Sequence, residues 1–217
     1  MARILILGAG FAGLWAALGA ARKRDEAGQR GADVEILVVD RNPYHNIRVR
    51  NYEVDISDAA IPLAKVLDPV GVGHLVADVE SIDTAKQKVA ISTARGPESL
   101  DYDRLVLALG SQLVRPAIPG LAESGFDVDT FAAAEKLCAH LSSLRARTGS
   151  PGRNTVCVVG AGFTGIEVAA EMPASTVIGR MNRPRLWRRP MQTEMIMPLR
   201  TSSRIIARRL SAAIGLL

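Results

Sequence analysis

The sequence predicts an α/β fold built around a parallel β-sheet, and three observations support this class. Two short apolar runs, residues 4–7 and 34–39, each have the length and composition of a buried strand. Residues 14–24 lie between them and are apolar and alanine-rich up to a basic end, which indicates a helix. A glycine-rich turn joins the first run to this helix. Strand, helix and strand in this order form the unit from which parallel sheets are built.

The turn is Gly8-Ala9-Gly10-Phe11-Ala12-Gly13. In a turn of this spacing the first glycine permits the tight bend, the second lets the backbone approach a pyrophosphate, and the third lets the helix pack closely on the sheet. The second strand ends in Asp40, and a carboxylate there would accept hydrogen bonds from a ribose. Together these features predict a Rossmann-like dinucleotide site. A glycine-rich turn that only closes a strand–helix corner is the alternative.

The segment that follows is expected to complete a first domain over residues 1–150. Residues 75–82 and 88–91 alternate in the manner of half-exposed antiparallel strands, with a turn at residues 96–97. Residues 102–111 are expected to form a strand buried on both faces. Residues 130–147 are expected to form a helix with Thr130 as its N-cap. The predicted domain is therefore a parallel sheet with helices plus an antiparallel β meander.

A second glycine-rich turn, Gly160-Ala161-Gly162-Phe163-Thr164-Gly165, repeats the first one later in the chain. Residues 155–159 are expected to form its strand and residues 166–171 the start of its helix, but no second strand and acid follow. Residues 151–172 are therefore expected to begin an incomplete second Rossmann-like unit. Two such turns indicate a protein that holds two dinucleotides face to face and moves electrons between them.

These motifs resemble those of the two-dinucleotide flavoproteins, the FAD-dependent pyridine-nucleotide oxidoreductases. Within that superfamily the chain most resembles type II NADH dehydrogenases, which are single-chain NADH:quinone oxidoreductases. The resemblance covers roughly residues 2–172 and rests on residues 3–13, 38–45, 102–111, 126–130 and 160–171. It implies that the first unit binds FAD and the second binds NAD(P)H. Hydride would pass from NADH to FAD, and electrons would then leave for a quinone or similar acceptor.

The resemblance also implies roles for individual residues. The first glycine turn would hold the FAD pyrophosphate, Asp40 its adenosine ribose, the backbone near Val79 its adenine, and Gly110 would lie near the flavin. A departure from the pattern is Leu109, which stands where many members carry threonine. The residues expected to contact FAD are Gly8, Gly10, Phe11, Ala12, Gly13, Asp40, Arg41, Val79, Gly110 and Ser111, and those expected to receive NADH are Gly160, Gly162 and Gly165.

Glu167 is the expected catalytic residue, again by resemblance. It would project toward the place where nicotinamide and flavin stack, where a carboxylate orients the nicotinamide or manages a proton. The alternative is a solvated acid in the first turn of a helix, where the helix dipole favours it.

The cysteines and histidines limit the redox and metal chemistry that is expected of the chain. Cys138, on the expected helix, and Cys157, in an expected buried strand, are the only two cysteines. Residues 42–58, where disulfide reductases of this superfamily carry their redox-active pair, contain none, so a dithiol relay is not expected. The three histidines lack metal-ligand spacing, and no metal site is expected. His45 has two interpretations: a residue that lines the flavin or contacts the adenosine, or a loop histidine with a satisfied hydrogen bond.

The net charge of +5 is concentrated near the end of the chain. Residues 172–217 hold nine arginines, no lysine and one acid, Glu194, which gives that segment +8 and residues 1–171 a charge of −3. The body is thus mildly acidic. Because the basic segment has neither interleaved aromatic residues nor a known nucleic-acid module, nucleic-acid binding is not expected.

Residues 173–217 are expected to form a basic, irregular tail. Pro173 is expected to end the helix after the second glycine turn, and Pro184, Pro190 and Pro198 interrupt any strand pattern. Our hypothesis is out-of-frame translation, or another truncation artefact, after about residue 172. The alternative is a basic amphipathic segment, residues 204–210, that lies on anionic lipid as a peripheral membrane contact.

The sequence therefore predicts an FAD-dependent NAD(P)H oxidoreductase that uses NADH and a quinone or other small acceptor. Two alternatives stay open: a truncated dinucleotide-binding fragment with little catalysis, and a ferredoxin- or rubredoxin-reductase-like flavoprotein. Few cysteines and no signal peptide indicate the cytoplasm, with the cytoplasmic face of the membrane as a second location. The sequence gives no indication of the oligomeric state.

Overall fold

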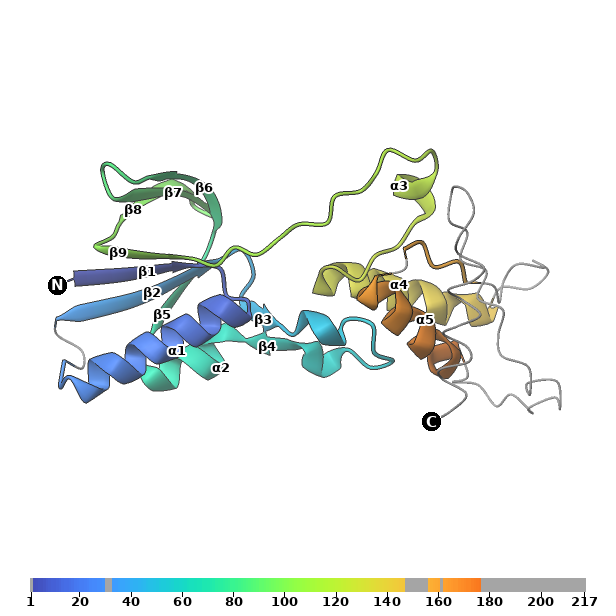
Figure 1. Cartoon of the computed structure of the whole chain (residues 1–217), viewed down its shortest axis with the longest axis horizontal. Helices are drawn as coiled ribbons and strands as arrows, with labels where there is room; N and C mark the ends of the chain where they lie inside the picture. Colours follow the sequence, from blue (N-terminus) through green and yellow to red (C-terminus); the bar gives the residue numbers. More distant parts are fainter. Residues whose placement is uncertain (1, 30–32, 147–155, 161, 177–217) are drawn as a thin grey trace. The chain divides into compact units, whose positions relative to one another are not determined.

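The computed structural model describes residues 2–29, 33–146, 156–160 and 162–176 (Figure 1). The chain divides into two units, Met1–Asn51 with Ile56–Ala134, and Tyr52–Asp55 with Glu135–Leu217. The expected domain boundary at residue 150 lies outside the described residues, as do residues 177–217 of the tail expected over residues 173–217.

A four-stranded parallel sheet forms the centre of the first unit and confirms the predicted fold class. Its strand order is β5-β2-β1-β9, and each adjacent pair is parallel. The strands are β1 (Ala2–Leu7), β2 (Val34–Asp40), β5 (Gly73–Val76) and β9 (Arg104–Leu107). Leu7 lies opposite Val39, so β1 and β2 end at the same edge of the sheet. This register brings the first glycine turn beside Asp40.

Helices cover one face of this sheet (Figure 1). They are α1 (Phe11–Glu26) and the short α2 (Leu63–Leu67). The small side chains of Ala17 and Ala21 let α1 approach the strands closely. The buried residues of this layer are Ile6, Ala9, Ala17, Ala21, Ile36, Val38, Leu63, Leu67 and Val72.

The basic end of α1 also has a packing function. Arg24 is 7% exposed, and its guanidinium donates hydrogen bonds to Gly71 O at 2.9 Å and Val70 O at 2.7 Å. These carbonyls immediately precede β5. The last turn of α1 therefore fixes the entry into the edge strand of the sheet.

The opposite face is covered by the antiparallel meander that the sequence predicts (Figure 1). Its strands are β6 (Asp78–Asp83), β7 (Lys88–Thr93) and β8 (Gly96–Asp101), in that order. Buried residues of sheet and meander meet in a second core made of Leu5, Leu7, Val39, Ala77, Val89, Ile91 and Tyr102. Because side chains alternate along a strand, β1 sends Leu5 and Leu7 to this core and Ile6 to the helical one.

Three strand predictions in this region were wrong in detail. The segment 75–82 belongs to two strands, since β5 ends at Val76 and β6 begins at Asp78. Ala77 N–H, between them, donates to Asp40 O at the end of β2 at 2.9 Å. Gly96-Pro97 begins β8 instead of forming the turn. The strand expected at residues 102–111 is the shorter β9, which lies at the edge of the sheet with Leu107 65% exposed. An apolar run does not distinguish an edge strand from a central one.

A small hairpin, β3 (Tyr44–Asn46) paired with β4 (Ala60–Pro62), extends the first unit. It is joined to the segment after residue 125 by Asn51, which is 2% exposed. The amides of Asn46 and Asn51 hydrogen-bond each other reciprocally at 2.8 and 3.1 Å, and Asn51 Nδ2 also donates to Val128 O at 3.0 Å. Buried amides are stable only when bonded in this way. The short helix α3 (Leu121–Ser124) belongs to the same unit.

Two longer helices follow in the chain, α4 (Phe131–Ser143) and α5 (Phe163–Thr176). Thr130 Oγ1 accepts a hydrogen bond from Ala133 N at 3.2 Å, which confirms Thr130 as the N-cap of α4. No helix within the described ranges is long and apolar enough to cross a membrane.

The region around the second glycine turn corrects three expectations. Residues 156–160 form no strand, and Thr155 lies outside the described residues. A strand exists only where a neighbouring strand completes its hydrogen bonds, and the described residues supply no neighbour for this segment. For the same reason Cys157 is exposed, not buried. The helix continues through Pro173 to Thr176, since a proline in a helix removes one hydrogen bond without having to end it.

Candidate dinucleotide-binding site

The first glycine turn joins β1 to α1, and two of its glycines are required by packing. Gly8 has φ +101°, and a Cβ added there would lie 2.2 Å from Ala108 O. A Cβ added at Gly13 would lie 1.8 Å from Gly8 O. Any larger side chain would therefore collide with backbone at either position. The turn is closed tightly, with the chain after β9 packed against it.

Gly10 differs from both, because a Cβ added there would meet nothing within 4 Å. Its φ of −66° is open to any residue, so neither packing nor backbone strain requires a glycine. Gly10 is the N-cap of α1 and provides no side-chain cap for the first N–H groups of the helix. Free N–H groups and open space at a helix N-terminus suit a phosphate group. The local structure therefore fits a dinucleotide pyrophosphate.

Asp40 stands at the end of β2 and holds this turn directly. Its Oδ2 accepts a hydrogen bond from Ala9 N at 2.7 Å, and its Oδ1 accepts one from Asn42 N at 2.8 Å. A carboxylate has about four lone-pair sites, so two engaged N–H donors leave capacity for ribose hydroxyls. The half-buried Asp40 is thus suited both to shape the turn and to bind a ribose.

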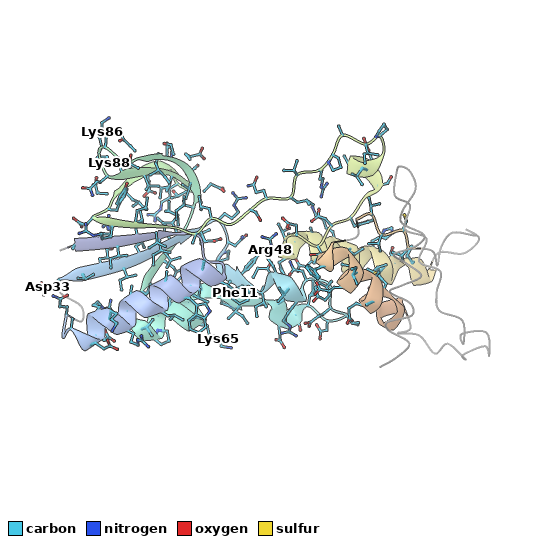
Figure 2. All side chains as sticks on the ribbon, in the orientation of Figure 1. Phe11, Asp33, Arg48, Lys65, Lys86 and Lys88 are labelled. Atoms are coloured by element: carbon cyan, nitrogen blue, oxygen red, sulfur yellow. The ribbon has the colours of Figure 1, made fainter. Side chains whose placement is uncertain are left out.

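His45 holds the same turn from the other side, a role that sequence reasoning missed. The imidazole is 5% exposed, its Nδ1 lies 2.7 Å from Ala9 O, and its ring makes an edge contact with Phe11 at 4.9 Å. Figure 2 shows Phe11 at the beginning of α1. His45 has the hydrogen bond that was expected, but the expected loop position is wrong, because His45 lies in β3. No signal in the sequence indicates that its partner is the glycine turn.

The other residues expected to contact FAD come from three segments near this edge of the sheet. Arg41 follows β2, and its Nε lies 3.3 Å from Asp78 Oδ1, beside Val79 on β6. Gly110, with φ +73°, and Ser111 follow β9 and are exposed, as is Ala12 on α1. The fold therefore gathers the turn, Asp40, and the ends of β2 and β9 at one edge. Their contact with a cofactor stays a prediction.

The second glycine turn has a similar local backbone. Gly160 has φ +113°, and a Cβ added at Gly165 would lie 2.2 Å from Gly160 O. A Cβ at Gly162 would meet nothing within 4 Å. Ile166 N donates to Gly162 O at 3.1 Å, as Leu14 N donates to Gly10 O at 2.9 Å. Ala161 lies outside the described residues.

Glu167 is exposed on α5 and lies near a tyrosine that the sequence did not indicate. Tyr52 is hydrogen-bonded to the Glu167 side chain within the second unit. Burial and the negative charge of Glu167, with smaller contributions from Glu53 and Glu171, raise the pKa of Tyr52 above its usual value. The phenol therefore stays protonated and can donate to the carboxylate. The catalytic role of Glu167 stays a prediction.

The cysteines and the acidic residues form no additional redox or metal centre where the chain is described. Cys138 and Cys157 are both free thiols. Burial, followed by the charges of Asp55 and Glu135, raises the pKa of Cys138 and lowers its reactivity. Across the described ranges, no three His, Cys, Asp or Glu side chains are grouped so as to hold a metal ion.

The chain is similar to several known proteins. The sequence profile of the family described as pyridine nucleotide-disulphide oxidoreductase matches residues 2–202. The match continues past residue 172, where the family pattern was expected to end, and the out-of-frame origin of the tail stays a prediction.

Two curated relatives are similar over most of this chain. An NADH dehydrogenase-like protein of Mycobacterium tuberculosis is 53% identical over 173 residues, which are 80% of this chain and 42% of that protein. A demethylphylloquinone reductase of Synechocystis is 35% identical over 176 residues, which are 78% of this chain and 42% of that protein. The chain thus spans less than half the length of these relatives.

Among solved structures, NDH2 from Plasmodium falciparum has a TM-score of 0.65 and 19% identity. The likeness covers 78% of this chain and 36% of that one. At this level of identity the comparison supports the fold alone.

Proposed function

This chain belongs to the pyridine nucleotide-disulphide oxidoreductase family, and on that premise we propose that it is an FAD-dependent NAD(P)H oxidoreductase. NADH would supply the hydride, bound FAD would supply the two-electron chemistry, and a quinone or similar small molecule would be the acceptor. The M. tuberculosis relative is named an NADH dehydrogenase-like protein and the Synechocystis relative a demethylphylloquinone reductase. Those names support NADH as the donor and a quinone as the acceptor.

The observation that carries the proposal is the first glycine turn. It combines open space at Gly10, uncapped N–H groups at the start of α1, and a carboxylate bonded to the turn. Packing explains why Gly8 and Gly13 are glycines, but it does not explain Gly10. A bound pyrophosphate does, because it needs close approach of the backbone.

In this proposal the first unit binds the cofactor and the second unit positions the nicotinamide. The N-terminus of α1 and Gly10 hold the FAD pyrophosphate, and Asp40 accepts hydrogen bonds from its ribose. FAD, when bound, supplies the two-electron chemistry. Gly160, Gly162 and Gly165 receive the nicotinamide nucleotide, and Glu167 orients the nicotinamide ring or holds a proton near it. The hydrogen bond from Tyr52 keeps the Glu167 carboxylate in one place.

Electrons need no dithiol on the way to the acceptor. The segment from Asn42 to Asp58 contains no cysteine. Cys138 lies on α4 with a raised pKa, and Cys157 lies in the exposed segment before the second turn. In the proposed reaction no thiol pair of this chain would therefore be needed between FAD and the acceptor.

A second candidate function is a dinucleotide-binding unit with little catalysis. The observation in its favour is the second turn, which has no strand over residues 156–160 and no acid bonded to it within the described residues. In this second candidate function the chain binds FAD but does not catalyse hydride transfer.

One experiment separates the two candidates. The purified chain is incubated with FAD, freed of unbound flavin, and mixed with NADH without oxygen while the visible flavin absorbance is recorded. Bleaching supports the oxidoreductase, and we expect Glu167→Gln to slow it by about 100-fold if the carboxylate acts on a proton. A yellow protein that NADH does not bleach supports the second candidate. A colourless protein contradicts both.

A further inference from the structure

We propose that His45 is a positioning residue for the FAD-binding turn, acting through the Ala9–Gly10 peptide. It fixes the direction of a backbone donor at the start of α1 and so prepares the turn for a pyrophosphate before any ligand arrives. The inference rests on the proposed function of the turn as an FAD site. It adds a second side chain, beside Asp40, that determines how well the turn binds.

Two successive peptide groups of the turn are held by side chains. Asp40 accepts from Ala9 N at 2.7 Å, and His45 Nδ1 lies 2.7 Å from Ala9 O. The first contact fixes the Gly8–Ala9 peptide and the second fixes the Ala9–Gly10 peptide. In a trans peptide the C=O and N–H of one unit point in opposite directions. By holding Ala9 O, His45 therefore aims Gly10 N–H away from itself, at the residue where the turn is open.

The contact also determines which nitrogen of the imidazole carries a hydrogen. A carbonyl oxygen only accepts hydrogen bonds, so Nδ1 of His45 must carry a hydrogen. The ring is held in place by its burial and by the edge contact with Phe11, whose own backbone is the first residue of α1. His45 thus contacts the turn on both sides of Gly10.

The hairpin provides a support that does not depend on the imidazole. His45 pairs with Ile61 in the antiparallel β3–β4 ladder, and Leu63 N donates to Pro43 O at 2.9 Å. Backbone bonds therefore keep β3 in position when the side chain is changed. Glycine loses more conformational entropy on ordering than other residues, so ordering the Gly8–Gly10 segment has a high entropic cost, and the contact to Ala9 O adds to the restraint from Asp40. Pre-ordering such a turn raises affinity by reducing this cost at binding.

The test compares three variants with the wild-type chain. His45→Phe keeps a flat ring in contact with Phe11 but removes the donor. His45→Asn places an amide N–H close to the position of Nδ1. His74→Asn is the matched control, since His74 lies on β5 with its Nδ1 3.7 Å from Asp68 Oδ1, and no hydrogen bond or ion pair within the described residues joins it to the turn. FAD affinity is measured by flavin fluorescence, and melting temperature reports the fold.

We expect His45→Phe to weaken FAD binding about five- to tenfold, as for one lost hydrogen bond. His45→Asn should restore affinity to within about twofold, and His74→Asn should not change it. Equal affinity of His45→Phe and wild type contradicts the inference. So does equal weakening in His45→Phe and His45→Asn, because that result assigns His45 a packing role only.

A second measurement keeps this inference separate from the FAD proposal. Amide hydrogen exchange over residues 8–13 is recorded in the chain without added FAD. We expect about tenfold faster exchange in His45→Phe than in wild type, with His45→Asn close to wild type. Unchanged exchange overturns the positioning role even if FAD binds. Failure of the wild-type chain to bind FAD overturns the proposed function, while the exchange result still decides whether His45 orders the turn.

Discussion

The two glycine turns have similar backbones and different surroundings. In each, the first glycine has a large positive φ, +101° at Gly8 and +113° at Gly160, and the third glycine lies against the carbonyl of the first. In each, the middle glycine faces open space. The local sequence is therefore enough to specify the shape of the turn, whichever unit it belongs to.

The two turns differ in the residues that contact them. At the first, Ala108 O lies 2.2 Å from where a Gly8 Cβ would be, Asp40 binds Ala9 N, and His45 binds Ala9 O. At Gly160, a Cβ would meet no atom of the described residues within 4 Å. A formed dinucleotide site thus needs residues far from the turn in the sequence. The first turn has them, and over the described residues the second has none in these positions.

The largest expected effect comes from adding one methyl group to the first glycine of each turn. Gly8→Ala combines an unfavourable φ with a collision against Ala108 O, and we expect it to lower the free energy of unfolding by about 3 kcal/mol or more. Gly160→Ala adds only the backbone strain, because its Cβ enters open space. We expect it to leave the main denaturant transition, that of the parallel sheet, within about 0.5 kcal/mol of wild type.

Urea unfolding followed by far-UV circular dichroism measures both variants. The wild-type chain and Gly28→Ala, a glycine with φ +70° and no neighbour within 4 Å, are the controls for strain without collision. Equal destabilisation by Gly8→Ala and Gly160→Ala would show that the surroundings of the turns do not differ as described.

A smaller effect is expected on the pKa of Tyr52, which contacts Glu167 on the helix after the second turn. Glu167 raises the pKa of Tyr52 by its charge and by a hydrogen bond, in addition to the effect of burial. We therefore expect Glu167→Gln to move the pKa of Tyr52 down toward its ordinary value, in a titration of the tyrosinate absorbance. Subtracting the curve of Tyr52→Phe isolates this residue from Tyr44 and Tyr102.

The sign of the linked stability change follows from the direction of the shift. A pKa raised by folding means that the unfolded chain loses the phenol proton first as the pH rises. The contribution of Tyr52 is therefore present below its ordinary pKa and is lost at higher pH. Glu135→Gln, on α4, is the matched control, since Glu135 is not among the residues that shift Tyr52. An unchanged Tyr52 titration in Glu167→Gln would contradict the contact between Tyr52 and α5.

The parts of the fold that sequence predicts well are those held by neighbours in the chain. β1, the first turn, α1 and β2 form one contiguous unit, and the Thr130 cap of α4 is a local hydrogen bond. The break at Ala77 and the edge position of β9 depend on which strands pair, which an apolar pattern does not specify. Cys157 was misplaced because a strand was expected without a partner strand.

The candidate site likewise contains residues that the sequence predicts and residues that it does not. Gly8, Gly10, Gly13 and Asp40 are recognisable by their spacing, since each has a position-specific physical role. His45 is not, because its partner Ala9 lies 36 residues away and nothing in the sequence indicates the contact. Tyr52 is missed for the same reason, with Glu167 far along the chain.

The central claim is that the first glycine turn, and not the second, is the FAD site of this chain. Gly10→Val and Gly162→Val test it, because a Cβ at either position meets no atom within 4 Å and both variants should fold with wild-type melting temperatures. FAD affinity is measured for both by flavin fluorescence. We predict a loss of about 100-fold or more in Gly10→Val, where the added side chain blocks the pyrophosphate, and a change of less than about twofold in Gly162→Val. Wild-type FAD affinity in folded Gly10→Val would contradict the account.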